Sequence, residues 1–131
     1  MRKNRAIQVL FLVAAIYDGL LGAAFLFASG ALFQWFGVAP PNHPGYAQFP
    51  AALLMVFAVM FLAIAVNPVR HRNLIPYGIL LKISYCGVVL FHWLTEGLPG
   101  MWKPFCLFDL VFLALFVWAR ARISGQETQD T

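Results

Sequence analysis

Residues 49–66 read FPAALLMVFAVMFLAIAV, an apolar stretch without a single ionisable side chain. About 17–25 predominantly apolar residues in a helix are enough to cross the hydrocarbon core of a bilayer. Three other stretches have the same character, and short connections between them favour antiparallel neighbours. The sequence therefore predicts an all-α fold, an antiparallel bundle of four transmembrane helices. The expected helices lie at about 6–28, 49–66, 74–95 and 102–120.

The composition supports a membrane protein. The 131 residues are 62% hydrophobic and 11% charged, and the mean hydropathy is +0.78. Soluble chains are about 45–50% apolar and about 25% charged. A soluble domain this small could not bury so much apolar surface, so lipid has to cover the remainder. We expect residues 1–123 to form one membrane domain and residues 124–131 a flexible polar tail.

Basic residues fall almost entirely on one side of the predicted membrane. Seven of the nine lysines and arginines belong to the N-terminus, the second loop and the C-terminal boundary, against Lys103 alone on the opposite side. Because basic segments stay in the cytoplasm, the chain is predicted to be a multi-pass protein of the cell membrane with cytoplasmic N- and C-termini. Anionic lipid headgroups are the expected partners of this net charge of +4, and nucleic acid is not. The seven are Arg2, Lys3, Arg5, Arg70, Arg72, Arg120 and Arg122.

Three ionisable residues fall inside predicted helices. An ionised group at the bilayer centre costs at least ~2.5–3.5 kcal/mol, so it should face protein and have a partner. With a rise of ~1.5 Å per residue, Lys82 lies roughly 12 Å from the cytoplasmic end of its helix, Asp18 roughly 18 Å and Asp109 roughly 17 Å. We predict that they form one buried charge cluster. Either the cluster is structural and fixes the helix register, or it belongs to a functional site.

One face of the predicted third helix carries a long polar stripe. Tyr85, His92 and Glu96 lie on this face with Lys82 and are further candidates for ligand contact, although His92 and Glu96 also suit the outer membrane boundary. Cys86, on the same face, lies at nearly the depth of the fourth helix's Cys106, which leaves free thiols and a disulfide as alternatives. The stripe consists of Lys82, Tyr85, Cys86, Val89, His92, Trp93 and Glu96.

Other parts of the chain carry fewer signals. The second helix, without ionisable residues, is expected to be scaffold or to face lipid. Residues 29–48 are expected to form a long outer loop, with ALFQWFGV at the headgroup level and a proline-rich second half. We predict no metal site, because the loop around His43 offers too few ligands, and no cofactor.

Several segments are similar to the small DoxX-like membrane proteins. These are YDGLLGAAFLF at 17–27, WFGVAPP at 35–41, the Asn67-Pro68 pair and YGILLKISY at 77–85. The resemblance implies a four-helix membrane protein, and the family's varied biochemistry implies no particular mechanism. The chain also resembles small multidrug transporters in its length and in a carboxylate, Asp18, in the first helix. It departs from them in its long first loop and its strong basic bias.

Three hypotheses for function follow. The first is an accessory membrane protein or a binder of a lipid-like ligand, whose partners are membrane lipids, a second copy or a partner membrane subunit. The second is a proton-coupled small-molecule transporter that uses Asp18 and Asp109. The third is a membrane enzyme that acts on an apolar substrate with the Lys82, Tyr85, His92 and Glu96 face.

Overall fold

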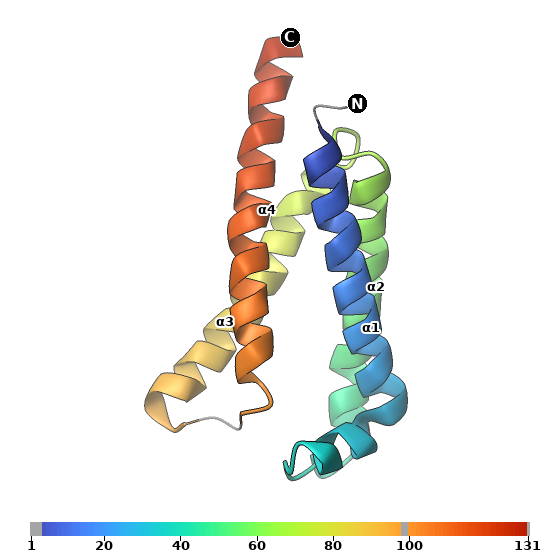
Figure 1. Ribbon diagram of the computed structural model, residues 1–131, viewed down its shortest axis with the longest axis vertical. Coiled ribbons are helices and arrows are strands. Elements are labelled where there is room, and N and C mark those ends of the chain that lie inside the picture. The colour runs from blue at the N-terminus through green and yellow to red at the C-terminus, as the bar shows by residue number, and fades with distance from the viewer. Residues whose placement is uncertain (1–3, 98–99, 131) are drawn as a thin grey trace.

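The computed structural model describes residues 4–97 and 100–130, and their side chains as far as residue 124. Within these ranges the chain is helical, with four long helices (Figure 1). All four are long and apolar enough to cross a membrane, which confirms the all-helical prediction and indicates a multi-pass membrane protein. The long helices are α1 (Arg5–Trp35), α2 (Gly45–Val66), α3 (Ile75–Thr95) and α4 (Lys103–Asp130), and the short η2 (Arg72–Leu74) precedes α3.

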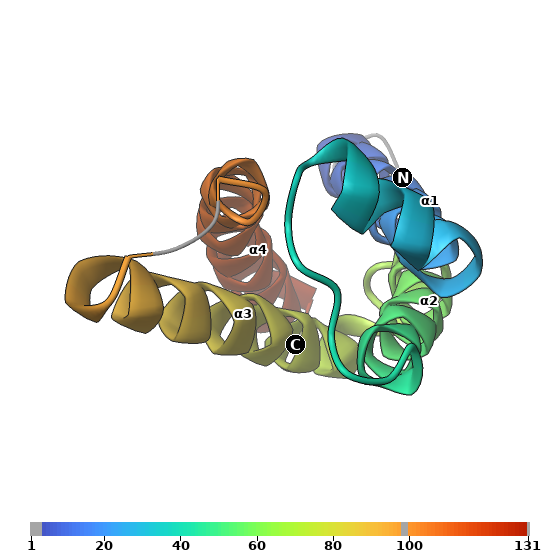
Figure 2. The ribbon, with the colours of Figure 1, turned by 90° about the horizontal axis from the view of Figure 1, so that it is seen from below.

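The helices associate as two pairs. Figures 1 and 2 show α1 beside α2 and α3 beside α4, and contacts within each pair far exceed those between the pairs. The start of α1 and the end of α4 lie at one end of the molecule, here called the terminal end. The α1–α2 and α3–α4 connections lie at the other, the loop end. The two pairs converge at the terminal end and diverge toward the loop end.

Most of the apolar surface of the helices faces outward. Only 22 to 28% of the residues in each membrane-length window are buried inside the protein. Large apolar side chains are among the most exposed, with Leu20 at 68%, Phe27 at 80% and Leu94 at 83%. Soluble proteins rarely expose contiguous apolar surface on this scale, so lipid is the environment that these faces fit.

Small residues bring α1 and α2 together. Gly22 is buried against α2, and a Cβ atom at that position would lie 2.7 Å from the carbonyl oxygen of Ala51. Ala15 is also buried, and a Cβ atom at Gly19 would lie 3.5 Å from that of Ala58. The glycines and alanines of α1 thus allow the two helices to approach closely, as small residues do at contacts between membrane helices.

The terminal end is a closely packed apolar core. It joins side chains from all four helices, and the Phe11 and Phe116 rings stack at its centre with their centroids 4.7 Å apart. The Phe61 ring lies 5.2 Å from that of Phe116. The core members with no exposed surface are Ile7, Phe11, Ala14, Phe61, Ile64, Ile75, Phe116, Ala119 and Ile123.

The predicted first loop is wrong in its first half. The helix α1 continues through residues 29–35 after a kink at Ala28, whose φ of −137° and ψ of 31° are not helical. The sequence SGALFQW contains no proline, and its Ser29-Gly30 pair is the kind of site where helices kink. Gly37, with a left-handed φ of 69°, follows the end of this segment, as glycines commonly do.

Two other helix boundaries differ from the prediction. The helix α2 begins at Gly45, one turn before the predicted start, and contains Pro50. The helix α4 continues to Asp130, where a polar tail was predicted from residue 124. The segment SGQETQD has no proline to stop the helix, and Gln and Glu are good helix formers.

Substitution of Gly22 tests the α1–α2 contact. In Gly22→Ala the new methyl group meets backbone, and overpacking of this kind costs about 1–3 kcal/mol. We expect a lower midpoint of thermal unfolding in detergent, followed by circular dichroism. Gly87→Ala is the matched control, because Gly87 is also helical but no atom from another helix lies within 4 Å of its added Cβ. Equal midpoints for the two variants would contradict this packing.

Candidate functional site

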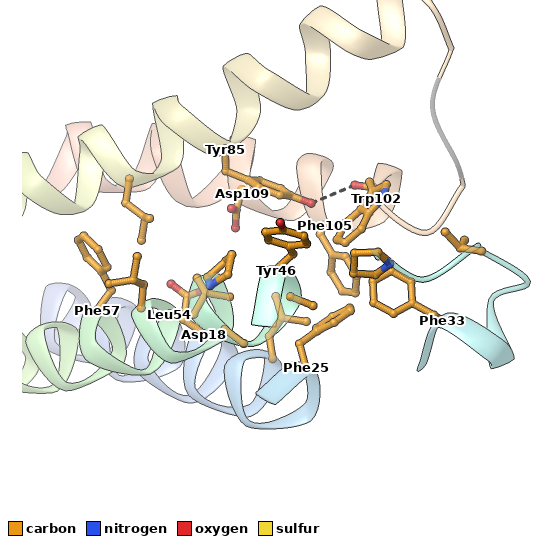
Figure 3. A pocket seen from close by; sticks show the side chains of 18 of the residues that line it. Asp18, Phe25, Phe33, Tyr46, Leu54, Phe57, Tyr85, Trp102, Phe105 and Asp109 are labelled. Carbon is orange, nitrogen blue, oxygen red and sulfur yellow. Dashed lines mark hydrogen bonds between the residues drawn. The ribbon is translucent and has the colours of Figure 1, made fainter. Parts of the chain in front are cut away.

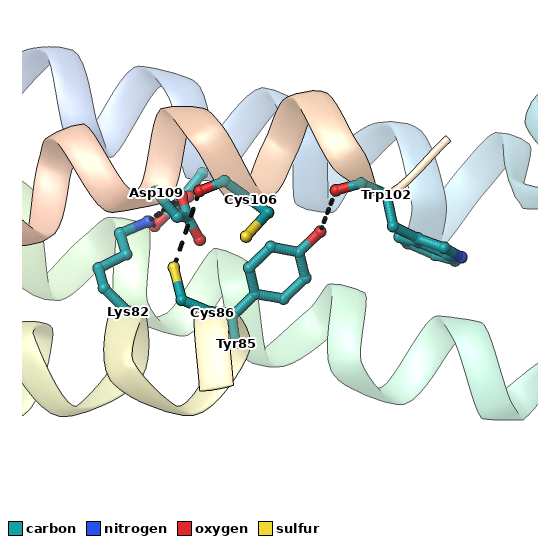
Figure 4. Close-up of polar contacts among 7 residues, drawn as sticks. Lys82, Tyr85, Cys86, Trp102, Cys106 and Asp109 are labelled. Atoms are coloured by element: carbon teal, nitrogen blue, oxygen red, sulfur yellow. Dashed lines mark hydrogen bonds and ion pairs between the residues drawn. The ribbon is translucent and has the colours of Figure 1, made fainter. Parts of the chain in front are cut away.

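The three predicted intramembrane charges meet in space. The Lys82 ammonium donates to both carboxylate oxygens of Asp18, at 3.1 and 3.0 Å. It also donates to Oδ1 of Asp109 at 3.0 Å (Figure 4). The exposed fractions of the residues are 0% for Lys82, 1% for Asp18 and 7% for Asp109. The predicted buried cluster is therefore confirmed.

The cluster joins the two helix pairs. Asp18 comes from α1, whereas Lys82 and Asp109 come from α3 and α4. Aromatic rings enclose the ammonium on its other sides, with Nζ 5.2 Å from the ring centroid of Phe112 and 5.8 Å from those of Tyr17 and Phe61. Such rings attract a cation through their negative faces, so Lys82 interacts with all four helices from its place on α3.

A cavity of about 650 Å³ lies on the loop-end side of the cluster (Figure 3). Its wall is mostly aliphatic and aromatic, and the two cluster carboxylates and the tyrosines Tyr46 and Tyr85 are its acidic and phenolic members. The lining residues are Asp18, Leu21, Phe25, Phe33, Val38, Ala39, Pro41, Tyr46, Ala47, Pro50, Ala51, Leu53, Leu54, Phe57, Leu81, Tyr85, Trp102, Phe105 and Asp109.

The carboxylates lie at the deep end of this cavity. On α1 and α4 the lining residues nearest the terminal end are Asp18 and Asp109, and on α2 and α3 they are Phe57 and Leu81. Beyond them begins the packed core of the terminal end. The cavity is therefore closed on that side, and among the described residues that line it the acidic ones, Asp18 and Asp109, lie at the closed end.

Aromatic side chains form the wall near the loop end. The Phe25 ring stacks on Trp102, with a centroid separation of 5.9 Å, and Phe33 meets the same indole at 6.3 Å. Phe33 belongs to the α1 segment beyond the kink, and Val38 and Pro41 follow it in the α1–α2 connection. The segment predicted to be a loop at the membrane surface thus contributes part of the cavity wall.

Sequence reasoning missed the contribution of α2. This helix was expected to be scaffold or to face lipid, yet it supplies more of the lining than any other helix. Its lining residues are apolar apart from the Tyr46 hydroxyl, so no charge marked them. Their spacing was the available signal, because Ala47, Pro50, Leu54 and Phe57 recur at intervals of three and four, as residues on one helix face do.

The predicted polar stripe on α3 divides into two parts. Lys82 and Tyr85 reach the cluster and the cavity, whereas His92 and Glu96 are not among the lining residues. His92 Nδ1 lies 2.9 Å from Oε1 of Glu96, and their side chains are 44% and 68% exposed. The far end of α3 diverges from the α1–α2 pair, which carries these two residues away from the site (Figure 1).

Local contacts fix the positions of the α3 side chains beside α4. The Tyr85 hydroxyl donates to the Trp102 carbonyl oxygen at 3.3 Å (Figure 4). Cys86 and Cys106 are both buried and both free, so the alternative of a disulfide is wrong. The Cys86 Sγ lies 3.8 Å from the carbonyl oxygen of Cys106 and helps to pack α3 against α4.

Comparison with family models, with curated proteins and with solved structures found no match to this chain. The fold and the site themselves define its class. It is a small, four-helix, multi-pass membrane protein with a buried Asp–Lys–Asp cluster at the closed end of an apolar cavity.

Removal of the central cation tests the cluster. Lys82→Met keeps an unbranched side chain that is shorter by the ammonium group, so two carboxylates lose their cation, and breaking a buried ion pair costs about 3–5 kcal/mol. We expect a large fall in the unfolding midpoint in detergent. The triple variant Lys82→Met, Asp18→Asn, Asp109→Asn should recover most of it, because no buried charge is left unpaired.

Lys103→Met is the matched control for this loss. Its ammonium lies at the loop end, 4.9 Å from the ring centroid of Trp93, and takes no part in the cluster. Two results would contradict the importance of the charge balance. One is an unfolding midpoint for Lys82→Met as high as that of Lys103→Met. The other is a triple variant that is no more stable than Lys82→Met.

Proposed function

We propose that this protein binds a lipid-like ligand in the cavity between its two helix pairs. The observation that carries the proposal is the cavity itself, about 650 Å³ in volume and lined mainly by aliphatic and aromatic side chains. Pockets that enclose drug-sized ligands have volumes of about 300–1,000 Å³ and the same apolar character, with a few polar groups at fixed places. The cavity has such polar groups in Asp18, Asp109 and two tyrosines.

The closed end of the cavity favours binding over passage. The core beyond Asp18 and Asp109 includes Phe11, Phe61 and Phe116, none of which has exposed surface. A ligand that enters from the loop end meets the carboxylates and goes no further. This supports a binding protein as the first choice. We also propose a relationship to the DoxX-like proteins, which rests on the similar sequence segments given above.

A proton-coupled transporter is the second candidate, because Asp18 and Asp109 both line the cavity. This function would need a second conformation in which the terminal core opens.

An enzyme has less support, since His92 and Glu96 pair with each other away from the cavity. Membrane lipids are the proposed partners of the exposed apolar faces, and a second copy or a partner membrane subunit is the proposed protein partner.

The proposal includes an orientation in the membrane. Arg5, Arg72 and Arg120 belong to segments at the terminal end, whereas Lys103 lies at the loop end. We propose that the helices run antiparallel and that both termini are cytoplasmic, because basic segments are retained on that side of a membrane. The cavity then faces the outer side of the cell membrane.

Photolabelling tests the proposed binding. A long-chain alcohol that carries a diazirine, added to the protein in phosphatidylcholine nanodiscs, should label cavity residues such as Leu54 and Phe57, as mapped by peptide mass spectrometry. Ala47→Trp, which fills part of the cavity, should reduce this labelling about tenfold, whereas Ala114→Trp on the exposed surface of α4 should not. Labelling confined to outward-facing residues such as Val111 would refute the proposal.

Reporter fusions test the proposed orientation. In a bacterial host, green fluorescent protein fused after residue 131 should fluoresce, and alkaline phosphatase at the same position should be inactive, because both reporters are then in the cytoplasm. Truncation after Asn42, in the α1–α2 connection, should reverse both results. Active phosphatase at the C-terminus would show that the orientation is inverted.

A further inference from the structure

We infer that the ligand is a lipophilic amine in its protonated form, whose N–H group donates to Asp109 at the closed end of the cavity. This inference rests on the proposed function and adds the chemical class of the ligand. It follows from three features of the site: the unequal use of the two carboxylates, the balance of charge, and the character of the wall around them.

The two carboxylates share Lys82 unequally. Both oxygens of Asp18 accept from the ammonium, whereas Asp109 accepts only through Oδ1. Within the described part of the chain, Oδ2 of Asp109 accepts no hydrogen bond. The Asp109 side chain is also 11% exposed, against 1% for Asp18. Among the carboxylate oxygens of the cluster, the one without a hydrogen bond in the described part of the chain is therefore Asp109 Oδ2, on a residue that lines the cavity.

With both carboxyl groups ionised, the cluster carries one more negative than positive charge. Two carboxylates and one ammonium give a net charge of −1 when all three groups are ionised. Within residues 4–97 and 100–124, whose side chains are described, no lysine, arginine or histidine lines the cavity. In sequence, the basic residue nearest to Asp109 is Lys103, but its ammonium lies over the Trp93 ring at the loop end. A monovalent cation bound beside Asp109 would complete the balance within a wall of low polarity, where charge–charge attraction is strong.

The wall suits an amine with a large apolar body. The deep end offers the Asp109 carboxylate and the Tyr85 ring from neighbouring helices (Figure 3). Toward the loop end follow Phe25, Phe105 and Trp102, which pack against one another. An aliphatic or aromatic body fits these side chains, and their ring faces attract rather than repel a cationic head. A hydrophilic cation would gain nothing from most of this surface.

A matched pair of probes tests the charge of the ligand. Two diazirine-bearing probes of equal chain length, one a primary amine and one an alcohol, are added separately to the protein in phosphatidylcholine nanodiscs. The amine should label the cavity residues at a concentration about tenfold or more lower than the alcohol needs, because one charge-assisted hydrogen bond increases the affinity by at least that factor. Equal labelling by the two probes would overturn the inference but leave the proposed binding function intact. Absence of cavity labelling by either probe would overturn both.

Substitution of Asp109 tests the place of the charge. Asp109→Asn should remove the preference for the amine, measured as the ratio of amine to alcohol labelling within the variant, whereas Asp109→Glu should retain the preference. Glu96→Gln is the matched control, because it removes a carboxylate at the loop end that does not line the cavity. A preference that survives in Asp109→Asn, or that Glu96→Gln removes, would overturn the inference. The comparison of the two probes on the unmodified protein stands even if Asp109→Asn fails to fold.

Discussion

The Lys82 ammonium, held between Asp18 and Asp109, is the interaction on which the rest of the structure depends. A lysine without exposed surface inside an apolar bundle is tolerated only when it is paired, and this one has three carboxylate oxygens within 3.1 Å. Because desolvation offsets much of the Coulomb attraction, the value of such a cluster lies largely in specificity. It sets which faces of α1, α3 and α4 meet, and at what depth.

That constraint explains why the two ends of the molecule differ. On one side of the cluster, side chains from all four helices interdigitate in a closed core. On the other side the helix pairs diverge, and residues of the kinked α1 segment and of the α1–α2 connection line the space between them. The cluster marks the transition between the two, so polar groups are available at the bottom of an otherwise apolar cavity.

Much of the fold could be predicted because a bilayer requires long apolar helices and makes buried charge costly, and both requirements are visible in the sequence. Apolar runs gave the helices, and the cost of intramembrane charge predicted that Asp18, Lys82 and Asp109 would meet. The cavity wall could not be predicted in the same way. The apolar residues of α2 face either lipid or cavity, and composition does not distinguish the two. Likewise, the periodicity of α3 places His92 on the face of Lys82 but says nothing about the divergence that separates them.

The order of synthesis gives the cluster a further consequence. Asp18 precedes Lys82 by 64 residues, and Asp109 follows it by 27. Chains emerge N-terminus first, so the α1–α2 pair is made with its carboxylate before the lysine exists. When α3 is made, Asp18 is already present as a partner for Lys82, whereas Asp109 has not yet been translated. The cavity is therefore completed only once α4 has been made, and a chain truncated before Asp109 lacks the site.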